Sequence, residues 1–201
     1  MNRIILSIET TTNICSVSLF QNKKLIYLFE DSNRKHSSLL GLFVEKIFIN
    51  SDIPIQSIDA IAISIGPGSY TGLRIGLSFA KGLAFSINKP IIPINTLESL
   101  NEGIKDLNYF LVLHAYKDNF FIQEYKNGKQ YGDIFFNTIN NIKNKKIYGY
   151  KNNLLKNCIN NISPCSKKIA RIAYKNYDNY IQNDIKLIKP NYVQPIEFNI
   201  K

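Results

Sequence analysis

The segment with the clearest chemical pattern joins an apolar run to a helix through closely spaced glycines. Residues 59–65 are almost continuously apolar and predict a buried strand, Gly66-Pro67-Gly68-Ser69 breaks it, and residues 71–87 predict a helix. Backbone N–H groups at such a helix start could hold an anion. The segment has neither the G-x-G-x-x-G spacing of a dinucleotide-binding turn nor the Lys-Ser/Thr ending of a P-loop. Its local chemistry leaves two interpretations open, an anion site and a tight turn that needs glycine, and favours the turn.

Other candidate catalytic groups lack partners at a useful spacing. The two histidines, His36 and His114, are 78 residues apart, whereas paired zinc ligands on one helix lie about four residues apart. Ser69 has no recognisable base to activate it. Glu9 and the three threonines after it could be the remnant of one phosphate loop, but the second half has no Asp-x-Gly counterpart for an actin-type ATPase site. We therefore expect no catalytic residue, no metal site and no cofactor.

The elements that hold the glycine segment follow a recognisable order. Three β-type runs are followed by a helix, a strand, the glycine segment with its helix, a further strand and a short helix. Alternation in the second run predicts a half-buried antiparallel strand. The order resembles the ribonuclease-H-like half of the actin and sugar-kinase superfamily, which predicts an α/β, actin-like (ASKHA) fold with a mixed sheet flanked by helices. The runs cover residues 4–10, 14–20 and 24–30, the helix 36–49, the last strand 90–94, and the short helix begins at Thr96.

The second half of the chain has a weaker pattern. Strands are predicted over 110–115, 120–125 and 147–150, helices over 152–158 and 166–174, and a polar loop over 140–146. Ser166 is the expected N-cap of the last helix. We expect a first lobe over residues 1–98, completed by a helix near 166–176, and a smaller, reduced α/β lobe over 99–165.

Both long helices of the first half carry more apolar or small residues than one buried stripe needs. Small residues recur every four positions in helix 71–87 and leave a ridge that another backbone can approach closely. The apolar residues of helix 36–49 cover more of its circumference than a core-facing stripe. Packing on the chain's own sheet and a subunit interface both remain open, and the interface is favoured. The residues are Leu39, Leu40, Leu42, Phe43, Val44, Ile47 and Phe48 in the first helix and Gly72, Gly76, Ala80 and Ala84 in the second.

Composition limits the class of protein further. With 45% hydrophobic and 20% charged residues, the 201-residue chain is globular, and it has no apolar run long enough for a membrane span and no expected signal peptide. Three cysteines without a C-x-x-C pair predict a reducing, cytoplasmic location. The net charge of +10 is concentrated in residues 101–201, which hold 16 basic and 8 acidic residues. This could indicate a nucleic-acid partner, but only four basic residues are Arg, and the bias of an AT-rich coding sequence is the favoured explanation of the lysines.

The run Gly66-Pro67-Gly68-Ser69-Tyr70-Thr71-Gly72-Leu73-Arg74-Ile75-Gly76 resembles the signature of the TsaB (YeaZ) family, bacterial relatives of the Gcp/M22 glycoprotease family. The resemblance is close over residues 1–100. The family's first strand usually ends in Asp where this chain has Glu9, and His114-Ala115-Tyr116 stands in place of its usual Asp-Ala-Arg. Further matching segments, in the family's order, are residues 5–11, 36–40, 80–84, 90–97 and 190–193.

The resemblance implies a non-catalytic subunit in the synthesis of threonylcarbamoyladenosine (t6A) at position 37 of tRNAs that read codons beginning with A. In that family the subunit supports TsaD, which transfers threonylcarbamoyl from threonylcarbamoyl-adenylate, and TsaE is an accessory ATPase of the larger complex. The tRNA is reached through the complex. Pairing with TsaD, or self-association of the isolated subunit, uses two helices, here 36–49 and 71–87. The implied interface residues are His36, Leu39, Leu40, Phe43, Ile47, Tyr70, Thr71, Gly72, Leu73, Gly76, Ala80 and Ala84, beside the signature loop Gly66, Pro67, Gly68 and Ser69.

Two other functions stay open. The first is an independent enzyme of the M22/actin-like class, either a weak ATPase or a peptidase, and the second is a free-standing tRNA-binding module. The missing helical histidine pair argues against a metallopeptidase. A nucleotide titration of the isolated chain distinguishes an ATPase from a binding subunit.

Overall fold

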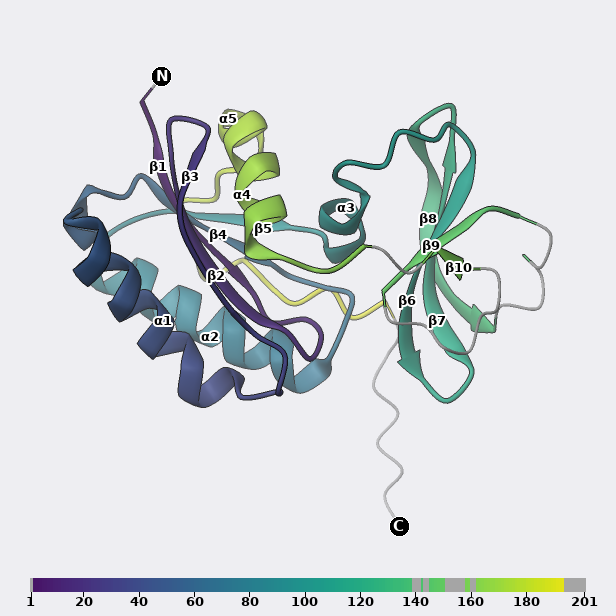
Figure 1. Ribbon diagram of the computed structural model, residues 1–201, viewed down its shortest axis with the longest axis horizontal. Helices are drawn as coiled ribbons and strands as arrows, with labels where there is room; N and C mark the ends of the chain where they lie inside the picture. The colour runs from purple at the N-terminus through teal and green to yellow at the C-terminus, as the bar shows by residue number, and fades with distance from the viewer. Residues whose placement is uncertain (1, 139–141, 143–144, 151–157, 160–161, 194–201) are drawn as a thin grey trace, which may run out of the picture.

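In a computed structural model of the protein, the chain forms two five-stranded sheets that lie beside each other (Figure 1). The structure describes residues 2–138, 142, 145–150, 158–159 and 162–193. The strand order is β3-β2-β1-β4-β5 in the first sheet and β8-β7-β6-β9-β10 in the second. In both sheets three antiparallel strands are followed by two parallel ones. This repeated ribonuclease-H-like order is the actin-like (ASKHA) fold that the sequence predicts.

The first sheet contains the elements predicted from the sequence, with ends shifted by one or two residues. β1 lies at its centre, where Ile5 is paired with Phe20 on one side and with Ala60 on the other. The elements in chain order are β1 (Ile4–Glu9), β2 (Cys15–Gln21), β3 (Lys24–Asp31), α1 (His36–Ser51), the 3-10 helix η1 (Ile55–Ser57), β4 (Ala60–Ser64), α2 (Tyr70–Ser86), β5 (Ile91–Ile94) and α3 (Thr96–Asn101).

Helices cover both faces of the first sheet (Figure 1). On one face, Leu40 and Ile47 of α1 share a core with Leu6 of β1 and with residues of α2. On the other face, Ile169 of α4 (Ser166–Lys175) packs with Ile5 of β1. Because both faces are covered, β2 is buried along nearly its whole length, and the expectation of a half-buried strand is wrong.

Helix α4 returns to the first sheet after the chain has passed through the second. Its first residue, Ser166, has its Oγ 2.7 Å from the Oγ of Ser16 in β2 and donates its backbone N–H to that oxygen at 3.0 Å. Because the helix begins at Ser166, the expectation that Ser166 is the N-cap is wrong. The N-cap is Cys165, whose side chain makes no capping hydrogen bond. The short helix α5 (Tyr177–Tyr180) follows. The division into lobes 1–98 with 166–176, and 99–165, stays a prediction.

The second sheet includes two strands, β8 and β10, that have no counterpart among the predictions. Both lie at edges of the sheet, and β8 is exposed along most of its length. The loop predicted over 140–146 and the helix over 152–158 lie largely outside the described residues, and Cys158 belongs to a strand. The strands are β6 (Tyr109–Tyr116), β7 (Asn119–Lys126), β8 (Lys129–Thr138), β9 (Ile147–Gly149) and β10 (Cys158–Ile159). Within the described residues, no helix is both long and apolar enough to cross a membrane.

Candidate functional site

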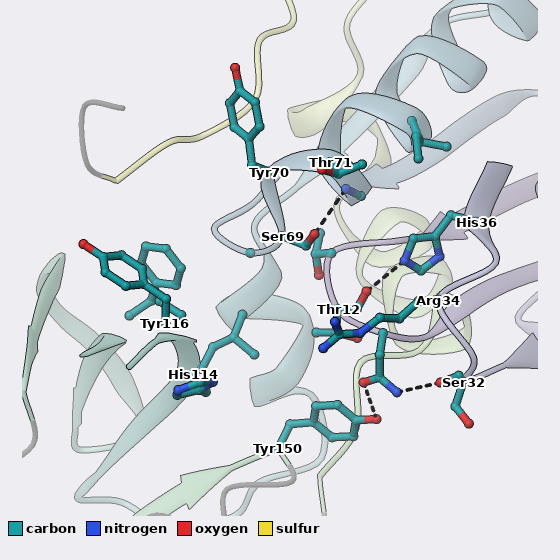
Figure 2. A pocket seen from close by; sticks show the side chains of 18 of the residues that line it. Thr12, Ser32, Arg34, His36, Ser69, Tyr70, Thr71, His114, Tyr116 and Tyr150 are labelled. Atoms are coloured by element: carbon teal, nitrogen blue, oxygen red, sulfur yellow. Dashed lines mark hydrogen bonds between the residues drawn. The ribbon is translucent and has the colours of Figure 1, made fainter. Parts of the chain in front are cut away.

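A pocket of about 970 Å³ lies between the two sheets (Figure 2). The first sheet contributes the turn after β1, the loop before α1 and the first turn of α2. The second sheet contributes the end of β6 and aromatic side chains beside it. The lining residues are Thr11, Thr12, Asn13, Ser32, Asn33, Arg34, His36, Ser37, Gly68, Ser69, Tyr70, Thr71, Gly72, Ile75, Leu113, His114, Ala115, Tyr116, Phe121 and Tyr150. The pocket therefore has a hydroxyl-rich wall and an aromatic wall.

The signature loop is packed tightly against the turn after β1. The backbone N–H of Ser69 donates to the carbonyl of Thr11 at 2.7 Å, and a Cβ on Gly68 would lie 2.4 Å from that same carbonyl oxygen. The Ser69 hydroxyl caps α2 by accepting from the N–H of Gly72 at 3.3 Å. The protein thus already occupies two of the N–H groups at this helix start. These contacts favour the tight-turn interpretation over an anion site.

Glu9 points into the protein and does not line the pocket. The side chain is fully buried, and its Oε1 accepts from the backbone N–H and the hydroxyl of Thr11, each at 2.5 Å. Its Oε2 has no hydrogen-bond partner among the described residues. Burial raises the pKa of Glu9, and the hydrogen bonds from Thr11 oppose this only in part. A carboxyl in this position is poorly placed to hold a magnesium ion for a ligand in the pocket.

A Glu9→Gln variant is therefore expected to be more stable than the parent chain at neutral and alkaline pH. Below the unfolded-state pKa of about 4.3, both states keep the proton and the advantage of the variant disappears. As pH rises toward the raised folded-state pKa, only the unfolded state releases the proton, so the parent chain loses stability that the variant keeps. Urea unfolding of both proteins between pH 4 and 9 measures this difference. Glu45→Gln, on the exposed face of α1, is the matched control; an advantage that grows toward acid pH would show that Glu9 is ionised in the folded protein.

The two histidines line the pocket from different elements, His36 from the start of helix α1 and His114 from strand β6 of the second sheet (Figure 2). His36 begins α1, as expected, and its Nε2 lies 2.9 Å from the carbonyl oxygen of Thr12, so this nitrogen carries the hydrogen. His114 lies in β6, with its Nε2 2.8 Å from the carbonyl oxygen of Lys117. Each ring is thus held by a backbone carbonyl of a nearby turn. In the described part of the chain, no three His, Cys, Asp or Glu side chains gather as metal ligands.

The small ridge of α2 faces the chain's own first sheet, which corrects the expectation that it faces a partner. A Cβ on Gly72 would lie 2.0 Å from the carbonyl oxygen of Thr10, and one on Gly76 would lie 2.2 Å from the hydroxyl of Thr10. Ala80 and Ala84 are buried in the core under α1 and α2. The ridge therefore allows the turn after β1 to approach α2.

Several apolar residues expected at the interface are buried in the same way. Leu40, Phe43 and Ile47 of α1 belong to the first core. Leu73 of α2 is also buried, with 1% of its surface exposed. The large apolar side chains that α1 and α2 do expose to solvent are different residues. They are Leu42 and Ile49 of α1, which are 39% and 67% exposed, and Phe85 of α2, which is 79% exposed.

The remaining expected interface residues lie near the start of each helix. His36 is buried and Leu39 half-buried in α1, whereas Thr71 is exposed in α2. Tyr70 is half-buried and packs against Tyr192 in a tilted arrangement, with the ring centroids 5.1 Å apart. The excess of apolar residues in helix 36–49 was the signal that could have identified Leu42. Phe85 had no such signal, because a single aromatic residue near a helix end fits a buried position equally well.

The chain is similar to known proteins over most of its length. Residues 29–192 match the family model "TsaD: tRNA N6-adenosine threonylcarbamoyltransferase". The "tRNA threonylcarbamoyladenosine biosynthesis protein TsaB" of Haemophilus influenzae is 34% identical over 107 residues, 53% of this chain and 45% of that protein. The Escherichia coli protein of the same name is 37% identical over 99 residues, 49% of this chain and 43% of that protein. The match thus spans less than half the length of these relatives.

The same fold is found in two solved structures. A Pseudomonas aeruginosa protein described as having "similarity to peptidase YEAZ" superposes with a TM-score of 0.80 and 17% identity, over 96% of this chain and 100% of that one. A second structure, "YeaZ from Pseudomonas aeruginosa", gives a TM-score of 0.77 at 18% identity, over 94% of this chain and 99% of that one. Together with the repeated sheet order, these structures confirm the actin-like architecture.

Proposed function

The chain belongs to the TsaD family of tRNA N6-adenosine threonylcarbamoyltransferases, and we propose that it acts in t6A synthesis as a non-catalytic subunit that binds TsaD. The observation that carries the proposal is its similarity to curated relatives named as TsaB proteins of threonylcarbamoyladenosine biosynthesis. TsaD, in this proposal, transfers threonylcarbamoyl from threonylcarbamoyl-adenylate to A37 of the tRNA. TsaE joins the larger complex.

The lack of an assembled catalytic group among the described residues supports the non-catalytic role. Glu9 is turned away from the pocket and accepts hydrogen bonds from Thr11. It stands where the family usually has Asp. His36 and His114 are each held by a backbone carbonyl, on different lobes. Nucleophilic catalysis needs a nucleophile and a base within hydrogen-bond reach of each other, and among the described residues the hydrogen-bond partner of each histidine is a backbone carbonyl and not a nucleophile or a carboxylate.

The exposed face of the α1–α2 pair is the surface that we propose for TsaD. The two helices lie next to each other (Figure 1), and a Cβ on Gly41 of α1 would be in van der Waals contact with the ring of Phe79 in α2, at 3.8 Å. Leu42, Ile49 and Phe85 expose apolar side chains on this pair. Buried apolar anchors supply most of the binding energy at protein interfaces. Self-association of the isolated chain is proposed to use the same face.

Reconstitution of the modification tests the role. TsaD with TsaE, threonylcarbamoyl-adenylate and unmodified tRNA should form t6A, detected by mass spectrometry of the nucleosides, only when this chain is added. The chain without TsaD should form none, and it should neither hydrolyse ATP nor hold a stoichiometric metal ion. Glu9→Gln should support TsaD as well as the parent chain does. Modification by the chain alone, or loss of activity in Glu9→Gln, would overturn the non-catalytic role and favour an independent enzyme.

A further inference from the structure

Helix α4 carries a row of cations on the side that faces away from the first sheet. Its apolar residues, among them Ile169 and Ala173, pack on that sheet and fix the orientation of the helix. Lys167, Arg171 and Lys175 recur every four residues, so they share one side of the helix. Arg171 and Lys175 are exposed, and Lys167 is half-buried. The row extends over about 12 Å of helix.

A hollow of about 560 Å³ beside this row gathers further positive charge. The side chains that line it are Arg3, Phe20, Lys23, Glu102, Arg171, Tyr174 and Lys175. Four of these are cations and one is a carboxylate. Arg3 is held by an ion pair with Asp178 at 2.7 Å and lies over the ring of Tyr177. Within the ranges that the structure describes, Lys23, Arg171 and Lys175 form no ion pair.

Lys168 adds to the crowding of like charge at the start of α4. Burial lowers its pKa and the neighbouring Arg171 acts in the same direction, whereas Glu102 opposes the shift. Cations that are close together and short of carboxylates repel one another unless an anion lies between them. The surface is therefore suited to an anionic partner with several charges.

We propose that this α4 face, made by Lys23, Lys167, Lys168, Arg171 and Lys175, binds the phosphate backbone of the tRNA. The inference rests on the proposed function, because that function supplies the tRNA. A row of about 12 Å spans several phosphates of a strand, whereas a single phosphate would use only one part of it. Four of the five cations are lysines, which contact phosphates as point charges and do not select a sequence.

The position of the face allows TsaD and tRNA to bind together. Helices α1 and α2 cover one side of the first sheet and α4 covers the other (Figure 1). A TsaD molecule on the exposed α1–α2 face therefore leaves α4 free. The subunit would act as a second contact for the tRNA that TsaD modifies, and would position the tRNA without touching A37.

The test compares the double variant Arg171→Gln/Lys175→Gln with the matched control Lys117→Gln/Lys129→Gln, whose lysines are exposed on the second lobe. Unmodified tRNA is titrated against the chain alone and against its complex with TsaD, at several salt concentrations. The α4 variant should bind about tenfold more weakly near 100 mM salt, and its plot of log K against log salt should be shallower by about 1.8, or 0.9 for each phosphate that the variant no longer neutralises. The control should change neither quantity.

Binding of TsaD to each variant, measured without tRNA, separates this inference from the proposed function. The α4 variant should bind TsaD as the parent chain does. Unchanged tRNA affinity and salt slope with normal TsaD binding would overturn the α4 proposal alone. Failure of the parent chain to bind TsaD would overturn the proposed function, while the titration of the chain alone would still test α4. Binding to vesicles that contain phosphatidylserine, with no binding to tRNA, would also overturn the proposal.

Discussion

Gly72→Ala should lower the stability of the protein more than most single methyl additions do. The added Cβ would lie 2.0 Å from the carbonyl oxygen of Thr10, and because that atom is backbone, relief requires α2 or the turn after β1 to move. The movement would also disturb the hydrogen bond from the Thr10 hydroxyl to the carbonyl of Gly72, now 2.8 Å. Overpacking of this kind costs about 1–3 kcal/mol, occasionally more. For a chain of this size that corresponds to a fall in melting temperature of roughly 2–12 °C.

Gly82→Ala is the matched control, because it makes the same change in the same helix. Gly82 is exposed and a Cβ there would meet no atom within 4 Å. Alanine should stabilise the helix at this position by about 0.5–1 kcal/mol. Thermal unfolding of both variants should therefore show shifts of opposite sign. Equal shifts would mean that the ridge is not packed against Thr10, and that it is available to a partner after all.

The double variant Leu42→Asp/Phe85→Asp should lose most of its affinity for TsaD and keep its fold. Both side chains are exposed, so the substitutions should change the free energy of unfolding by less than about 0.5 kcal/mol each. In an apolar interface each would remove an anchor and bury a charge. Loss of an anchor costs about 2 kcal/mol or more, and two such losses correspond to a decrease in affinity of roughly a thousandfold. Calorimetric titration of the folded variant with TsaD measures the effect.

Leu107→Asp provides the control for this experiment. Leu107 is 60% exposed but lies just before β6 of the second sheet and belongs to neither α1 nor α2. Its substitution should leave the affinity for TsaD unchanged. If the double variant binds TsaD like the parent chain, the exposed face of α1 and α2 is not the interface. Sedimentation of the isolated double variant also tests self-association, which should weaken together with TsaD binding.

The first sheet and helices α1 and α2 could be predicted because their sequence patterns are local. Residues 36–49 and 71–87 have helical spacing, and residues 59–65 form an apolar run between turn signals. The strand β8 could not be found in this way. It is an exposed edge strand, so its side chains lack the alternation that a buried face imposes. The position of β8 is set by its antiparallel pairing with β7.

The direction of the α2 ridge could not be read from the sequence for a different reason. Four small residues on one side of a helix show that something approaches closely, and they do not show what. The neighbour is Thr10, 62 residues earlier in the chain. The buried position of Glu9 depends on the same long-range packing. The sequence therefore predicted the existence of the two helices correctly and left open which of their faces was already covered.

The contact between Ser16 and Ser166 joins two parts of the chain that are made at different times during synthesis. The two residues are 150 positions apart, and α4 covers Ile5, Ala62 and Ile92 on the first sheet. The strands of the first sheet emerge from the ribosome before α4 exists, so this side of the sheet stays open to water until the strands of the second sheet have also been made. Contacts of such long separation form slowly, and open apolar surface favours aggregation meanwhile. The nascent chain thus needs protection on the side that α4 finally covers.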